Sequence, residues 1–309
     1  MILGLSQACY RWMIYPHLRQ ALPGRGVEGY RRGYMRSIAP PGEGESVHEW
    51  LIARCVELGL GGLYATSAWE GARETAGLFR RRMNAAGLVY VGNVSLDFAA
   101  TAEEWETGEF AAAAAKISWV AAAGGRLAAA THRRAAEINH FTSSPAVSEQ
   151  LERAVQNFAS LVPACAENGV VLALENHMDY RLSELVRVVE GVDSEWVRIN
   201  MDTGNTIGVI EDPLDGARAA ATYAVNAHLK DLRVQPITVM GEPRVFWAPL
   251  GQGHVPLRKI LELLQASAVD PAALPVMLEV APPPDQDAHL WVRESIDWLR
   301  RECGQFFAP

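Results

Sequence analysis

Short apolar runs alternate with amphipathic stretches along the chain, and we count eight such pairs. Apolar runs of about five residues are typical of strands buried on both faces, as in a parallel sheet, whereas apolar positions three or four residues apart indicate helices. The predicted strands are Ile2–Cys9, Gly61–Thr66, Leu88–Val94, Arg126–Ala130, Val170–Leu174, Val197–Met201, Ala224–Leu229 and Pro275–Val280. The predicted helices are Val47–Leu58, Trp69–Ala86, Ala102–Ala123, Val147–Asn168, Ser183–Glu190, Pro213–Thr222, Leu257–Ala266 and Gln286–Cys303.

Many boundaries of these elements carry residues that end or begin helices. The predicted ends are Gly59, Gly87, Gly124 and Gly169, and the predicted starts are Ser46, Ser148 and Asp212 followed by Pro213. Eight βα units predict a closed (β/α)8 TIM barrel, an α/β fold of typically ~250 residues. We therefore expect residues 1–309 to form a single domain.

A doubly wound open sheet is the alternative fold, and it would normally carry a nucleotide-binding signature. Gly24, Gly26 and Gly29 match the spacing GxGxxG. The residues before them read HLRQALP, where that signature needs a strand. We therefore favour the barrel.

Two irregular segments are long enough to predict a function. Residues 11–45 contain six arginines with interleaved aromatic residues, among them Trp12, and follow the first strand. This segment is expected over the mouth of the barrel as a lid, a subunit contact, a clamp for an anionic substrate or simply a solvated loop. Residues 232–250, after strand seven, hold two extended runs around a Met240–Pro243 turn and predict a small hairpin.

Composition limits the partners. Net charge is −8 and the isoelectric point is near 5.5, which argues against general binding to nucleic acid. No apolar run approaches the ~20 residues that span a bilayer, and no basic leader precedes the first strand, so we expect a cytoplasmic protein without a membrane partner. The four cysteines are widely spaced without a CxxC pair, which predicts buried free thiols in a reducing compartment.

Polar side chains stand at the carboxyl ends of the last four predicted strands. Glu175, Asn176 and His177 follow the apolar run of strand five directly, and the next three strands carry related groups. Those groups are Asp202 on strand six, His228 and Lys230 on strand seven, and Glu279 on strand eight. The carboxyl ends of parallel strands meet at one face of a barrel, so we expect one shared site.

Three carboxylates and one imidazole form a mostly hard ligand set. Glu175, Asp202, His228 and Glu279 suit Mn²⁺, Mg²⁺ or Co²⁺ better than a thiolate-rich zinc site. Such a set leaves coordination positions for two substrate oxygens, which is typical of a catalytic metal. Buried acids at strand ends can instead cap helices or pair with arginines, but four successive strand ends favour the metal.

The segments LENH, MDTGN, HLKD and LEV at the ends of strands five to eight resemble those of the xylose isomerase-like TIM barrels. This sugar (phosphate) isomerase/epimerase superfamily includes ketose 3-epimerases and inosose dehydratases. The resemblance covers nearly the whole chain. It implies that Glu175, Asp202, His228 and Glu279 hold one divalent metal, with Mn²⁺ foremost. It also implies that the two glutamates move protons on opposite faces of a substrate carbon.

Physical chemistry is consistent with such a reaction on a small carbohydrate. A metal bound to adjacent carbonyl and hydroxyl oxygens stabilises the enediolate that forms when a carbon-bound proton leaves. A second carboxylate that returns the proton gives epimerisation, and return to the neighbouring carbon gives isomerisation. The predicted substrate contacts are His177, Lys230, Asn205 and Trp12. Structural hydrogen bonding of His177 and a salt bridge from Lys230 to Asp231 or another acid are the alternatives.

One departure leaves the sugar open. Many relatives have histidine where this chain has Asn205, and an amide is a poorer metal ligand. A lyase of the same fold, such as an inosose dehydratase or an enzyme that eliminates from 3-oxo-glycosides, is the alternative. An abasic-site endonuclease is more remote, because Thr66, Asn93 and Asn205 stand where it would need histidines. We expect a homo-oligomer, as is common for such barrels.

Overall fold

The computed structural model describes residues 1–14, 34–42, 44–66, 75–236, 241, 243–283 and 285–307. Most of the arginine-rich segment and the tip of the hairpin lie outside these ranges. The predicted roles of residues 15–33 are therefore not addressed by the structure.

Eight parallel strands close into a barrel in the order β1-β10-β7-β6-β5-β4-β3-β2. From β1 to β7 each strand pairs with the next along the chain, β7 then pairs with β10, and β10 pairs with β1 to close the ring. The strands are β1 Ile2–Ser6, β2 Gly62–Tyr64, β3 Val89–Leu96, β4 Leu127–His132, β5 Val171–Glu175, β6 Val197–Asp202, β7 Ala224–Leu229 and β10 Pro275–Leu278. The predicted TIM barrel is confirmed.

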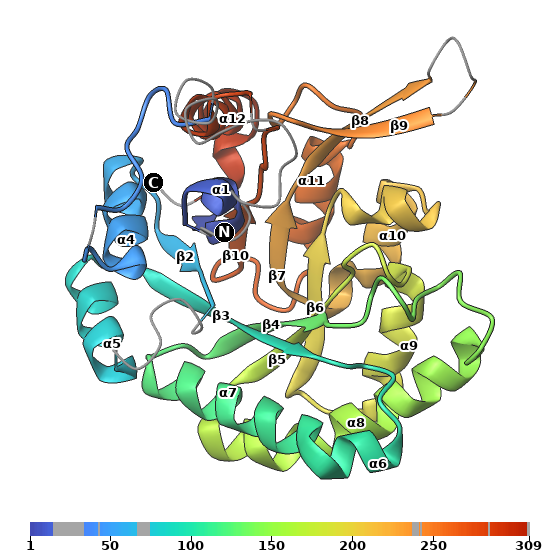
Figure 1. Cartoon of the computed structure of the whole chain (residues 1–309). Coiled ribbons are helices and arrows are strands. Elements are labelled where there is room, and N and C mark those ends of the chain that lie inside the picture. Colours follow the sequence, from blue (N-terminus) through green and yellow to red (C-terminus); the bar gives the residue numbers. More distant parts are fainter. Residues whose placement is uncertain are drawn as a thin grey trace.

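Helices connect the strands and surround the ring (Figure 1). They are α1 Arg11–Ile14, α4 Val47–Glu57, α5 Ala76–Ala85, α6 Ala102–Glu104, α7 Phe110–Ala122, α8 Val147–Asn168, α9 Leu182–Val192, α10 Pro213–Ala220, α11 Leu257–Ser267 and α12 Ala288–Cys303. Between β7 and α11, strands β8 Asp231–Pro236 and β9 Pro243–Ala248 pair antiparallel and project from the barrel as the predicted hairpin.

Three predicted elements show the main differences from the observed ones, and other bounds shift by one or two residues. The first strand ends at Ser6, because the Ser6 Oγ accepts a hydrogen bond from the Ala8 N–H and Gln7–Tyr10 turn into a 3-10 helix. The third predicted helix contains a wider π-helical turn at Trp105–Glu109 between α6 and α7. The second begins at Ala76 within the described residues, whereas its predicted start at Trp69 lies outside them.

Most of the predicted helix boundaries are confirmed. The four glycines expected to end helices all adopt positive φ, from 62° at Gly169 to 87° at Gly124. Ser46 and Asp212 accept hydrogen bonds from backbone N–H groups of the first helical turn. The Ser148 prediction is wrong, because α8 begins at Val147 with Ala146 as its N-cap residue.

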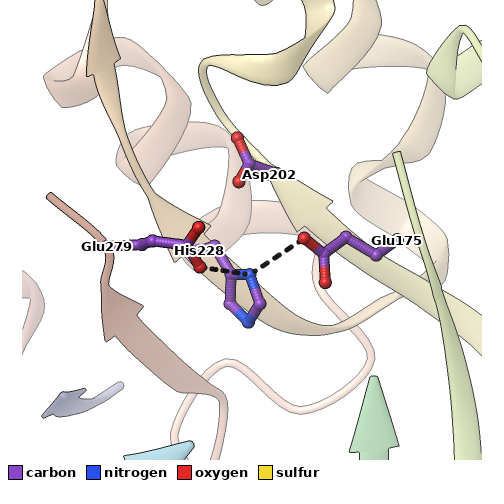
Figure 2. Close-up of side chains that lie close together, drawn as sticks. All are labelled: Glu175, Asp202, His228 and Glu279. Carbon is purple, nitrogen blue, oxygen red and sulfur yellow. Dashed lines mark ion pairs between the residues drawn. The ribbon is translucent and has the colours of Figure 1, made fainter. Parts of the chain in front are cut away.

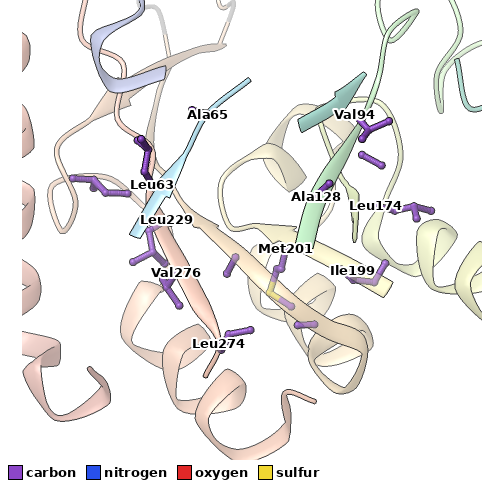
Figure 3. Packing of buried hydrophobic residues seen from close by; sticks show 14 of the residues in the cluster. Leu63, Ala65, Val94, Ala128, Leu174, Ile199, Met201, Leu229, Leu274 and Val276 are labelled. Atoms are coloured by element: carbon purple, nitrogen blue, oxygen red, sulfur yellow. The ribbon is translucent and has the colours of Figure 1, made fainter. Parts of the chain in front are cut away.

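The core has two layers. Side chains such as Leu63, Leu229 and Val276 point from the strands toward the helices (Figure 3). Inside the ring, Tyr64, Val91, Ala129 and Met277 form a separate buried cluster. The side chain of Met277 fits because Gly4 and Gly62 face it, and a Cβ on Gly4 would lie only 2.3 Å from the Met277 sulfur.

Alternation along each strand separates the two layers. On β10, Leu278 faces the helices, whereas Met277 and Glu279 lie on the inner side. The barrel interior is therefore filled by the cluster around Met277, and the candidate metal ligands lie next to it at the carboxyl ends of the strands. No helix in the described ranges is both long and apolar enough to cross a membrane.

All four cysteines are buried and free, as predicted. Burial raises the pKa of the Cys9 and Cys165 thiols to about 12, so almost no reactive thiolate is present near neutral pH.

We predict that the native protein does not react with the thiol reagent DTNB at pH 8, whereas four thiols react in guanidinium chloride. Rapid titration of the native protein would contradict this packing.

Candidate metal centre and cavity

The ends of β5, β6, β7 and β10 bring the four predicted metal ligands together. Glu175, Asp202, His228 and Glu279 each offer a ligand atom, and these atoms all lie within 4.8 Å of one another. None of the four residues is more than 6% exposed. Figure 2 shows Glu175 and Glu279 approaching from opposite sides of the His228 ring, with Asp202 beside them.

His228 lies between the two glutamates. Its Nδ1 is 3.4 Å from Glu175 Oε1 and 3.2 Å from Glu279 Oε2. The Tyr64 ring packs against the imidazole with 4.6 Å between ring centroids. The imidazole therefore has a fixed orientation, with one nitrogen directed at both carboxylates.

Neighbouring side chains also orient the glutamates. The Asn200 amide donates a hydrogen bond to Glu175 Oε2 at 3.0 Å, and the Ser6 hydroxyl donates one to Glu279 Oε2 at 3.2 Å. Ser6 ends β1, the strand that follows β10 around the ring. Such supporting groups hold a ligand set in position before any ion binds.

Asp202 is held by the backbone. Its Oδ1 accepts hydrogen bonds from the N–H groups of Gly204 and Asn205, both at 2.9 Å. The Asn176 amide pairs with the N–H and C=O of Asp202 and so ties the end of β5 to β6. Asp202 Oδ2 accepts no hydrogen bond of good geometry, although Lys230 Nζ lies 2.7 Å away.

Lys230 is buried behind the site. Its ammonium pairs with Asp202 and, at 3.2 Å, with Glu279 Oε1, and it donates a hydrogen bond to Asn205 Oδ1 at 2.9 Å. The predicted alternative of an ion pair with an acid is thus observed, but with Asp202 and Glu279. Asp231 instead accepts hydrogen bonds from backbone N–H groups at residues 251, 253 and 255.

The buried charges shift one another's ionisation. Burial alone would raise the pKa of the Glu279 carboxyl, but nearby cations, Lys230 foremost, lower it to about 2. Burial likewise opposes a charge on His228, but Glu175 and then Glu279 raise the pKa of its imidazole to about 9. The glutamates are therefore ionised at neutral pH and stabilise positive charge between them.

The residues present fit a divalent metal. Three carboxylates and an imidazole converge, and one buried oxygen, Asp202 Oδ2, lacks a hydrogen bond. Oxygen-rich sets of this kind bind hard divalent cations, which would offset the mutual repulsion of the three acids. Within the described residues this is the one group of three or more His, Cys, Asp or Glu side chains with such a geometry.

A cavity of about 540 Å³ opens above the centre. It is bounded by the carboxyl ends of strands, with Gln7, Tyr64, Asn93, Thr131, Glu175 and Glu279 among its lining residues. Asp202 and His228 are 0% exposed and do not line it. The two glutamates therefore face the cavity, while the other two candidate ligands lie behind them.

The predicted substrate contacts have different positions. His177 is exposed and lines the cavity beside Glu175. Lys230 and Asn205 are 2% and 1% exposed and bind each other below it. Trp12 packs against the hydrophobic core and is not among the lining residues. Contact of these four residues with a substrate stays a prediction.

Several cavity residues were not singled out from the sequence. Gln7, Tyr64, Thr131 and Arg133 line the wall formed by β1, β2 and β4, and Arg11 lies at the start of α1. The sequence feature that could have identified these residues is their position at or just beyond the ends of the first four strands. Those strand ends carry no series of candidate metal ligands, so the sequence pointed to them less strongly than to the last four.

A short turn presents His177 to the cavity. Asp179 is fully buried and accepts hydrogen bonds from the N–H groups of His177 and Tyr180, while Met178 between them has a φ of 61°. The other carboxylate oxygen of Asp179 has no hydrogen-bond partner. Burial raises the pKa of this carboxyl to about 6.

Comparison with known proteins agrees with this architecture. A family model described as xylose isomerase-like TIM barrel matches residues 52–302. The chain belongs to the xylose isomerase-like TIM barrel family. The resemblance seen in the strand-end segments is thereby confirmed.

This chain shares only short, weakly identical segments with two relatives of known sequence. A segment of 71 residues is 28% identical to a 3-oxo-isoapionate decarboxylase of Pectobacterium atrosepticum, and covers 23% of this chain and 26% of that protein. The alignments span only about a quarter of the curated relatives, 28% and 26% of their lengths.

Solved structures share the fold across the full length. IOLI protein with a bound zinc atom has a TM-score of 0.70 at 12% identity, with all of both chains covered. D-psicose 3-epimerase of Clostridium cellulolyticum, in complex with D-tagatose, has a TM-score of 0.68 at 14% identity and the same coverage.

The metal centre predicts a thermal shift. Added Mn²⁺ at about a hundred times its dissociation constant should stabilise the native state by about 2.7 kcal/mol. For a chain of 309 residues that corresponds to a rise in Tm of roughly 4 °C, which calorimetry measures after treatment with a chelator. Asp202→Asn and Glu279→Gln should each greatly reduce the rise, whereas Asp215→Asn on exposed α10 should preserve it. Equal shifts in all variants would contradict the ligand assignment.

The Asp179 turn predicts a pH dependence of stability. Because the folded pKa of about 6 exceeds the ordinary value of 3.8, the folded state retains the proton longer. Its contribution is therefore full below about pH 4 and is lost as pH rises through 6, about 3 kcal/mol in total. Urea unfolding of wild type and Asp179→Asn at pH 4.5 and 7.5 measures this.

The expected outcome is that Asp179→Asn gains stability relative to wild type as pH rises. Asparagine retains the oxygen that binds the two N–H groups but carries no charge. A constant difference between the two proteins over this pH range would show that Asp179 does not titrate in this way.

Proposed function

We propose that the protein is a divalent-metal-dependent sugar isomerase or epimerase that moves a proton next to a carbonyl group. The observation that carries this proposal is the placement of Glu175 and Glu279. Both face one cavity, and they approach the His228 nitrogen from opposite sides (Figure 2). A substrate carbon between them would have one carboxylate on each face.

The electrostatics suit proton transfer by carboxylates. Despite burial, interaction with His228 lowers the pKa of Glu175, and Lys230 and other cations lower that of Glu279. An ionised glutamate accepts a proton from carbon, and the second glutamate returns one from the other face or to the neighbouring carbon. Asn200 and Ser6 hold the two carboxylates in place during this exchange.

A bound divalent ion would supply stabilisation of the negative charge that develops on the substrate oxygens. We assign Glu175, Asp202, His228 and Glu279 to hold it. The oxygen-rich donor set favours Mn²⁺, with Mg²⁺ or Co²⁺ as alternatives.

The cavity wall suits a carbohydrate. Gln7, Tyr64, Asn93 and Thr131 offer amide and hydroxyl groups, and the volume of about 540 Å³ accommodates a free sugar. Similarity of fold to D-psicose 3-epimerase supports a ketose or related polyol as substrate. His177 is the exposed side chain best placed to contact a substrate hydroxyl beside Glu175.

A lyase is the second candidate. The same carboxylate pair would remove a proton and then assist departure of a neighbouring group. The partial similarity to 3-oxo-isoapionate decarboxylase favours keeping this candidate, because that name also denotes breaking a bond next to an oxo group. The single candidate ligand cluster in the described residues gives no support to a nuclease with several metals.

Glu175→Gln and Glu279→Gln test the proton-transfer roles. Each should slow exchange of a substrate C–H with solvent by about 10²–10⁴-fold, because glutamine carries no exchangeable carboxyl proton. Proton NMR in D₂O measures this over ketoses, inososes and 3-oxo-glycosides, with the Mg²⁺ concentration raised for each variant until its thermal shift saturates, so that loss of metal is not mistaken for loss of proton transfer. Glu149→Gln on the surface of α8 is the matched control.

The products separate the two candidate reactions. Metal-dependent loss of a C–H signal with retention of the carbon skeleton supports the isomerase or epimerase. Release of water, carbon dioxide or an aglycone supports the lyase instead. Unchanged exchange in both glutamine variants would overturn the assigned roles.

A further inference from the structure

Arg11 is a charged cavity residue to which the proposed proton transfer assigns no role. It begins α1 directly after the 3-10 turn that follows β1, and it lines the cavity with Glu175 and Glu279. Arginine is suited to bidentate recognition of planar anions, since its guanidinium presents a rigid fork of N–H donors.

Two contacts with described residues orient the guanidinium of Arg11. The Arg11 Nε donates a hydrogen bond to Ala8 O at 3.3 Å, and Cζ lies 5.0 Å from the ring centroid of Trp247 on β9. Stacking on an indole orients the plane of the guanidinium. Among the described residues no carboxylate pairs with Arg11, so both terminal nitrogens remain available.

The charges around the cavity show why Arg11 is suited to bind an anion. A divalent ion and Lys230 together supply three positive charges, which match Glu175, Asp202 and Glu279. Among the described residues that line the cavity, the other arginine, Arg133, is paired with Glu109. Counted over these described residues and with metal bound, Arg11 is therefore one positive charge in excess at the cavity wall.

We propose that Arg11 binds a carboxylate on the substrate, so that the preferred substrate is an acidic sugar rather than a neutral one. This inference rests on the proposed function for the identity of the site. A single excess charge and one planar fork match a monoanionic carboxylate better than a phosphate ester, which carries nearly two charges and commonly engages several donors.

Three probes that differ only at C6 test the inference: D-fructose, D-fructuronate and D-fructose 6-phosphate. Calorimetric titration of the Mg²⁺-loaded protein gives a dissociation constant for each probe. Wild type should bind D-fructuronate about tenfold more tightly than D-fructose, as expected for a charge-assisted pair. Arg11→Met should abolish this preference while leaving the D-fructose constant within about twofold.

Further variants separate charge from geometry and place. Arg11→Lys should retain only part of the preference, because a point charge lacks the fork. Arg258→Met, which removes an exposed arginine of α11, should retain all of it. Loss of the preference in Arg133→Ala but not in Arg11→Met would overturn the assignment to Arg11.

The remaining outcomes are also decisive. A larger gain for D-fructose 6-phosphate than for D-fructuronate would overturn the carboxylate in favour of a phosphate. Absence of any preference in wild type, including failure to bind all three probes, would overturn the inference altogether. Hydrogen exchange is followed on the same samples, so a binding preference without exchange would count against the proposed function alone.

Discussion

Three carboxylates buried on the inner face of the barrel set the main constraint on this structure. Glu175, Asp202 and Glu279 lie close enough to repel one another in surroundings that solvate them poorly. The fold answers with nearby cations and with backbone N–H donors. Lys230 pairs with two of the acids, and the His228 nitrogen lies between the two glutamates. A divalent ion would complete this compensation, so the same repulsion that costs stability provides affinity for a metal.

Hydrogen bonds with neighbouring asparagines hold Asp202 and Lys230 in fixed positions. Asn176 ties the backbone of Asp202 to the end of β5, and Asn205 connects Asp202 with Lys230. Asn205 therefore has a structural role where a histidine would offer a further imidazole. The result is a compact centre whose two glutamates line the cavity, and the first four strands and α1 contribute other lining residues.

The β8–β9 hairpin and α1 are in contact at that cavity wall. Trp247 of β9 packs against both Arg11 and Lys230, with 5.0 Å and 4.7 Å from the ring centroid to the respective cation. One indole thus contacts a cation of the buried centre and a cation at the cavity. An element outside the barrel ring therefore contacts both cations.

Much of this protein was determined by local sequence. The βα repeat predicted the barrel, because a buried parallel strand needs an apolar run and each crossover needs a helix. Asp202, His228 and Glu279 stand at the carboxyl ends of apolar runs, and such ends meet at one face of a barrel, which is why the ligand cluster was predictable. The cluster was proposed from four strand ends, and the structure brings those atoms together.

Other features depended on ring closure. Closing β10 against β1 brings Ser6 to Glu279, although 273 residues separate them. The partners of Lys230 were open in the sequence, where Asp231 was the nearest acid along the chain. Only the tertiary structure decided for Asp202 and Glu279, because the ends of β6 and β10 flank β7 while Asp231 turns toward backbone N–H groups after the hairpin. Sequence determined which side chains face inward, and closure of the ring determined which of them meet.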